Sequence, residues 1–139
     1  MHHLRNAIVV SSWIERAKMA IENASEDIVT VDLHPEPDMG TELATVASLV
    51  RLRGQCDVVV DFSNADIVTS ASLSKLLQLR KLLTDCGHRL ILCSLSADTE
   101  SIFTVTALDQ VFEFARDKSA ALTAIRSAEQ SASEVHGPA

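Results

Sequence analysis

The chain has 139 residues, a length that fits one domain, and its apolar content of 47% is enough to build a hydrophobic core. Its formal charge of −7 disfavours a nucleic-acid binder, because no basic stripe is present to meet phosphates. No apolar run approaches the ~18 residues of a membrane span, and Ala7 to Val10 is too brief for a signal-peptide core. We therefore expect a cytoplasmic protein whose partners are other proteins.

The N-terminal stretch allows two interpretations. Residues 12–24 fit a helix in which Ser12 is the cap and Glu15 its capping-box partner. The same stretch could instead hold an edge strand at residues 19–22 and a hairpin turn at 23–27. We favour the helix, and we treat residues 1–27 as an N-terminal extension, either helix or edge strand.

From residue 28 onward the sequence predicts strands that alternate with helices. The expected strands are 28–33, 57–62, 89–94 and 110–114. The expected helices are 41–53, capped by Thr41 or Asp38, then 70–86, a short helix capped by Ser96 or Asp98, and 117–128. In the short helix, Ile102, Phe103 and Val105 are expected to face inward. Such alternation indicates βαβ units and a largely parallel sheet, here over residues 28–126, with a flexible C-terminal tail at 127–139.

The stretch from Asp57 to Leu83 organises the rest. Its apolar run, residues 58–60, suits a strand covered on both faces and ends at Asp61. Turn formers follow, and then cap formers open an amphipathic helix. The turn formers are Ser63, Asn64 and Asp66; the cap formers are Thr69, Ser70 and Ser72; the expected inner face is Leu73, Leu76, Leu77, Arg80 and Leu83. Hydroxyl groups therefore gather where a helix offers free N–H groups and partial positive charge.

Catalytic motifs are missing from the sequence. Its four glycines cannot build a phosphate loop, and no GxSxG motif is present. Asp61 and Asp66 could indicate acid–base catalysis or a magnesium site. Such a pair is more often an aspartate at a strand end followed by a turn residue. The three cysteines, Cys56, Cys86 and Cys93, are odd in number and widely spaced, which argues against disulfides and zinc. We expect no enzymatic activity, no cofactor and no metal.

Four segments carry a resemblance to a known family. Residues 61–68 match the pattern D-[LF]-S-x-[VA]-x-[FIV]-[ILV], and residues 69–74 stand where that family has D-S-S-G-L-G. Residues 89–93 and 101–112 match its next strand and its following helix and strand. Over residues 28–126 the chain thus resembles the STAS domain family of bacterial anti-sigma-factor antagonists. The resemblance implies a single α/β domain with a four- to five-stranded mixed sheet and helices packed mainly on one face.

The resemblance also implies a switch. In the antagonists, the first Ser of D-S-S-G is phosphorylated by a serine kinase that is also the anti-sigma factor, and that Ser corresponds to Ser70. The unphosphorylated form binds this partner and frees the sigma factor, whereas the phosphorylated form does not bind. A helix N-terminus tolerates the added charge of about −1.5 to −2, so the fold can survive while its surface changes sign.

Three departures from the motif leave other interpretations open. Thr69 replaces the family's Asp, Ala71 its second Ser, and Ser72 and Ser74 its glycines, which adds side chains where a partner could approach. Ser70 could be a plain helix cap, and Thr69 is expected to be a cap or turn residue. Lys75 and Arg80, with Lys81, could dock an acidic partner or a phosphate, or simply be solvated. The alternative function is a scaffold or transporter-accessory domain that binds a protein without phosphorylation; a nucleotide-binding domain is disfavoured.

Overall fold

A five-stranded sheet forms the centre of the structure, a computed structural model that describes residues 21–25, 27–65 and 69–135. The strands lie in chain order; β2 to β5 are parallel, and β1 pairs antiparallel with β2. Their bounds are β1 Ile21–Ser25, β2 Ile28–Asp32, β3 Asp57–Asp61, β4 Leu90–Cys93 and β5 Glu113–Ala115. Because β2 to β5 are parallel, their carboxyl ends meet at one edge of the sheet, where the loops before the helices also lie.

A helix follows each of the strands β2 to β5, which confirms the predicted alternation. These helices are α2 Asp38–Arg53, α3 Ser70–Asp85, α4 Ala97–Val105 and α5 Lys118–Val135, and the short 3-10 helix η1, Leu108–Gln110, comes after α4. The crossovers through α2 and α3 let neighbouring strands run in the same direction.

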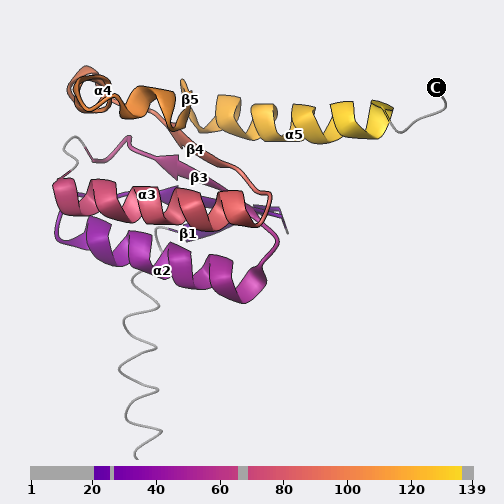
Figure 1. Cartoon of the computed structure of the whole chain (residues 1–139), viewed down its shortest axis with the longest axis horizontal. Helices are drawn as coiled ribbons and strands as arrows, with labels where there is room; N and C mark the ends of the chain where they lie inside the picture. Colours follow the sequence, from indigo (N-terminus) through magenta and orange to yellow (C-terminus); the bar gives the residue numbers. More distant parts are fainter. Residues whose placement is uncertain (1–20, 26, 66–68, 136–139) are drawn as a thin grey trace, which may run out of the picture.

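The helices cover both faces of the sheet, so the expectation of helices mainly on one face is wrong: apolar residues point from the strands to both sides, and each side has its own core cluster. Helices α2 and α3 lie side by side on one face, and α5 covers the other (Figure 1). The alternation along β3 shows this, since Val58 and Val60 pack in the cluster on the α2–α3 side. Val59, between them, packs in a second cluster with Ala121 and Ile125 of α5. The continuous apolar run of β3 is thereby explained, because each of its residues faces a helical layer.

The prediction of a helix at residues 12–24 is wrong for its last part, because residues 21–24 belong to β1. Ile21 pairs with Val31 and packs against the core, so β1 supplies partners for a backbone edge that β2 would otherwise expose. The alternative interpretation is confirmed in having an edge strand here, but residues 23–25, which it assigned to a hairpin turn, belong to the strand at 21–25. Residues 1–20 lie outside the described part, and the division at residue 28 stays a prediction.

The segment after α4 also differs from expectation. The strand expected at 110–114 is β5 at Glu113–Ala115, and η1 occupies residues 108–110. Phe112 is buried just before β5 and meets the ring of Phe103 edge-on at 5.6 Å, so aromatic packing places it in the core instead of the sheet. Phe103 faces inward as predicted, but Val105, in the last turn of α4, is 85% exposed.

Two helix boundaries differ as well. Helix α2 starts at Asp38 with Pro37 at the N-cap and no side-chain cap, so neither Asp38 nor Thr41 is the cap. The acidic Asp38 in its first turn still complements the helix dipole. Gly54, with φ of 68°, ends α2 as predicted. Helix α5 continues to Val135, beyond the expected end near Ala128; the flexibility of residues 127–139 stays a prediction.

Candidate functional site

The loop after β3 begins with a turn built on Asp61. One carboxylate oxygen, Oδ1, accepts hydrogen bonds from the Ser63 backbone N–H at 2.7 Å and from the Ser63 hydroxyl at 2.5 Å. This arrangement is an Asx-type turn, in which an aspartate side chain binds the backbone two residues on. Ser63 is therefore occupied in shaping the loop, while Asn64 next to it is exposed. Asp66, proposed above as a possible partner of Asp61, lies outside the described residues.

Thr69, not Ser70, caps α3. Thr69 has an extended backbone, and its hydroxyl oxygen accepts the N–H of Ser72 at 3.1 Å. Its carbonyl accepts the first intrahelical bond, from Leu73, at 2.8 Å. This confirms Thr69 as a cap and makes the interpretation of Ser70 as a plain cap wrong. Ser70 has helical geometry already, so its hydroxyl cannot take the capping position.

Ser70 is the first residue of α3 and is exposed. Among the described residues, its hydroxyl has no hydrogen-bond partner. The backbone N–H groups of Ser70 and Ala71 precede the first intrahelical bond, so they belong to the donors that a helix start leaves for solvent or an anion. An exposed hydroxyl thus lies next to backbone donors and the positive end of the helix dipole.

Ser72 is buried, with 1% of its surface exposed, and it binds a carboxylate from a distant part of the chain. Its hydroxyl donates to Oε1 of Glu36, in the loop between β2 and α2, through a short hydrogen bond. The Thr69 hydroxyl lies 3.4 Å from the same oxygen. We call Glu36, Thr69 and Ser72 the hydroxyl–carboxylate cluster. Ser72 therefore adds no side chain to the surface, contrary to the expectation for a glycine replacement.

The cluster places an acidic group beside α3 although Thr69 replaces the family's Asp. Sequence reasoning missed Glu36, because it stands 36 positions before Ser72 and carries no local motif. The only signal was its place between Pro35 and Pro37, which fixes a loop after β2, at the edge of the sheet where the α3 start also lies.

The faces of α3 differ from the predicted pattern by part of a turn. Its buried residues are Ser72, Leu76, Leu79 and Leu83, whereas Leu77, predicted to face inward, is 37% exposed. The exposed side instead carries Ser70, Ser74, Leu77 and Lys81, which follow one another at helical spacing. Ser70 and Ser74 thus share one open face of α3 with a partly exposed leucine.

The two basic candidates point to different neighbours. Lys75 faces α2, and its ammonium donates to the Gly40 carbonyl at 3.3 Å. Arg80 lies on the other side of α3, where its Nε donates to the Val111 carbonyl at 2.7 Å. The structure therefore does not bring Lys75 and Arg80 together. Lys81 has a different kind of partner from Arg80, an exposed ion pair with Asp85 at 3.0 Å.

Cys93, at the end of β4, has the wrong environment for a nucleophile. Burial, with a smaller effect of the Asp61 charge, raises its pKa to about 12, so the thiol stays protonated at neutral pH. Burial also raises the pKa of Cys56. Within the described ranges, no group of three His, Cys, Asp or Glu side chains is placed to hold a metal ion. No helix described is both long and apolar enough to cross a membrane.

Comparison with known families agrees with this architecture. The family model of the STAS domain matches residues 9–121, which is most of the chain. The chain therefore belongs to the STAS domain family. No curated protein sequence matches the chain significantly.

Solved structures extend the comparison at the level of the fold. An anti-sigma-factor antagonist (STAS) domain protein from Planctomyces limnophilus is 20% identical; the match covers 76% of this chain and 97% of that one, with a TM-score of 0.61. A variant of RsbS from Moorella thermoacetica is 17% identical, with coverages of 79% and 98% and a TM-score of 0.61. The Bacillus cell fate determinant SpoIIAA in its phosphorylated form is 16% identical, with coverages of 76% and 96% and a TM-score of 0.59.

Proposed function

We propose that this protein is a non-enzymatic, cytoplasmic signalling module that binds a serine-kinase/anti-sigma partner through the surface around the start of α3 and is switched by phosphorylation of Ser70. One observation carries the proposal. Thr69 performs the capping, so the exposed Ser70 hydroxyl has no structural task among the described residues. A hydroxyl that the fold does not need is available for modification without loss of the helix cap.

The chemistry of the helix start supports a switch that leaves the fold intact. A phosphate on Ser70 would lie near the positive end of α3 and near backbone donors, which stabilises its charge. SpoIIAA, which has a similar fold, has been solved in its phosphorylated and its unphosphorylated form. Glu36, which binds Ser72 and lies near Thr69, already brings one negative charge to this helix start, so a phosphate on Ser70 would make the local surface strongly negative. A partner that buries this surface against neutral or acidic groups would then be expelled.

Phosphate transfer is the direct test. The full chain is incubated with ATP and the serine kinase encoded nearest to it, and the intact mass is measured. We expect one added phosphate on the parent protein and none on Ser70→Ala. Ser74→Ala is the matched control, because Ser74 is an exposed serine on the same face of α3, and it should be labelled like the parent.

Partner binding tests the consequence. Ser70→Asp should bind the same kinase much more weakly than the parent, while Ser74→Asp should retain binding if the charge must stand at the helix start. Parental affinity in Ser70→Asp would contradict the switch. If Ser70→Ala is labelled as well as the parent, the site is wrong. Binding without any labelling would favour the alternative, a scaffold or transporter-accessory STAS domain.

A further inference from the structure

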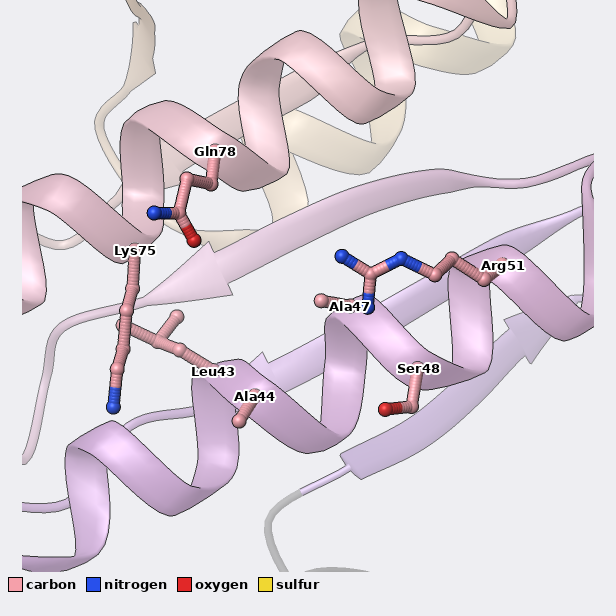
Figure 2. Close-up of a pocket in the computed structure, with 7 residues that line it drawn as sticks. All are labelled: Leu43, Ala44, Ala47, Ser48, Arg51, Lys75 and Gln78. Atoms are coloured by element: carbon pink, nitrogen blue, oxygen red, sulfur yellow. The ribbon is translucent and has the colours of Figure 1, made fainter.

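A shallow groove runs between α2 and α3, and Figure 2 shows the side chains that line it. On the α2 side, small residues form its wall at helical spacing: Ala44, Ala47 and Ser48. Arg51 lies farther along the same side, and α3 contributes Lys75 and Gln78. Lys75 follows Ser70 by little more than one turn along α3 but lies about 140° around its axis, so the groove lies on a different face of α3 from Ser70.

The groove has an unusual charge for this chain. The protein has 19 acidic and 12 basic residues, yet the groove lining contains two cations and no acid. Neither cation forms an ion pair within residues 21–25, 27–65 and 69–135; Lys75 has only the Gly40 carbonyl, 3.3 Å away. Two unpaired positive charges in a strongly negative protein favour an anionic group from outside.

The size of the groove limits what that group can be. Its volume is about 210 Å³, below the roughly 300–1,000 Å³ of pockets that bury small-molecule ligands. The space suits one or two side chains of a macromolecule instead. A net charge of −7 opposes an extended anionic surface such as nucleic acid or an anionic membrane. A short acidic segment of another protein instead faces mainly the two cations of the groove, because more distant charges are screened by salt.

We propose that the α2–α3 groove docks an acidic segment of a protein partner, whose Glu or Asp side chains would meet Lys75 toward the start of α2 and Arg51 farther along it (Figure 2). The small side chains of Ala44, Ala47 and Ser48 let the partner's backbone come close, while Gln78 supplies an amide for hydrogen bonding. The inference rests on the proposed function in one respect, that the partner is a protein, and it adds the chemistry by which that partner is recognised. Arg51 and its α2 neighbours were not among the partner-docking candidates predicted from the sequence, which were Lys75 and Arg80.

A peptide titration tests the groove without the partner. The uniformly ¹⁵N-labelled full chain is titrated at low salt with a helical peptide of Glu-Ala-Ala-Ala-Glu repeats, and amide shifts are followed. Saturable shifts should centre on residues 44–51 and 75–78. They should weaken with added salt, because the charges are exposed. In the double variant Arg51→Glu/Lys75→Glu, binding should fall by about tenfold or more.

The controls separate this occupant from others. Lys81→Glu makes the same charge change on the same helix outside the groove lining and should retain at least half of the parental affinity. A peptide with Lys in place of each Glu should not shift the groove. The proposal is overturned if no saturable shift occurs, if shifts centre elsewhere, or if sodium acetate at equal carboxylate concentration or vesicles containing phosphatidylglycerol give the same response. Ser70 takes no part in this titration, so failure of the groove and failure of the switch give separate results.

Discussion

The units β3–α3 and β4–α4 have nearly the same local structure but different surroundings. Their strands end at the paired positions Asp61 and Cys93. The helix caps, Thr69 and Ser96, each accept the N–H of the residue three positions on. That residue has a buried hydroxyl in both cases, Ser72 with 1% and Thr99 with 0% exposure.

The difference lies in what is added to the cap. Helix α3 starts with the exposed Ser70, where α4 starts with Ala97. The buried hydroxyl of α3 also binds Glu36 from a distant loop. A capping hydroxyl and a buried hydroxyl three residues after the cap are therefore structural features that both helices share. The exposed serine as the first helical residue of α3 is the feature that α4, which starts with Ala97, does not share.

The largest effect should come from the core contact that holds α4. Phe103 is its main buried apolar side chain and meets Phe112 and Phe114 edge-on, at 5.6 and 5.3 Å. Phe103→Ala should lower the free energy of unfolding by about 3–5 kcal/mol, measured by urea denaturation. Val105→Ala, on the exposed end of α4, should cost less than about 0.5 kcal/mol. Equal effects would mean that α4 does not depend on this packing.

Disrupting the hydroxyl–carboxylate cluster should give the next largest loss of stability. Ser72→Ala removes the donor to Glu36, and the loss of a hydrogen bond to a charged group should cost about 1–2 kcal/mol, reduced because Glu36 can regain water. The matched control Ser74→Ala changes an exposed serine on the same helix and should stay within about 0.5 kcal/mol of the parent. Similar values for both variants would contradict the cluster.

Removing either cap should lower the free energy of unfolding by a similar amount. Thr69→Ala and Ser96→Ala should each cost about 1 kcal/mol in the same assay, since each loses one bond to a backbone N–H. Ser70→Ala should cost clearly less than Thr69→Ala, because Ser70 is not the cap. If Ser70→Ala is the more costly of the two, the assignment of the cap is reversed.

The smallest expected effect is the extent of alkylation of the buried cysteines at neutral pH. Burial raises the pKa of Cys93 to about 12 and also raises the pKa of Cys56, so neither is a thiolate near pH 7.5. Iodoacetamide should modify the exposed Cys86 of the native protein and leave Cys56 and Cys93 unmodified until urea unfolds it. Mass spectrometry of the alkylated protein counts the modified thiols; rapid labelling of Cys93 would contradict its burial at the end of β4.

Much of the fold was predictable because it depends on local patterns. The run Val58–Val60 and the glycine after α2 have meanings that hold in almost any setting. Strand β1 was not favoured, since its pairing with β2 is a tertiary contact that overrides a helical pattern. Phe112 moved out of the expected strand for a similar reason, its packing on Phe103.

The candidate site was predictable in its place but not in its details. Thr69 and Ser70 are both cap formers, and the sequence does not say at which of them the chain turns into the helix. Glu36 joins Ser72 only after β2 and β3 pair, so no local window contains the contact. The groove depends on how α2 and α3 pack, which brings Arg51 of α2 and Lys75 of α3 into the lining of the same groove.

The position of the phosphate in the labelled protein is the most direct test of phosphorylation at Ser70. Trypsin cleaves after Arg53 and Lys75, so one peptide, residues 54–75, contains Ser63, Thr69, Ser70, Ser72 and Ser74. After labelling by the partner kinase, fragmentation of this peptide should place the phosphate on Ser70 alone, because Ser70 combines an exposed hydroxyl, without a partner among the described residues, with a position at the start of α3. A phosphate on Thr69, the cap, or on the buried Ser72 would contradict the account, and so would a phosphate on Ser74.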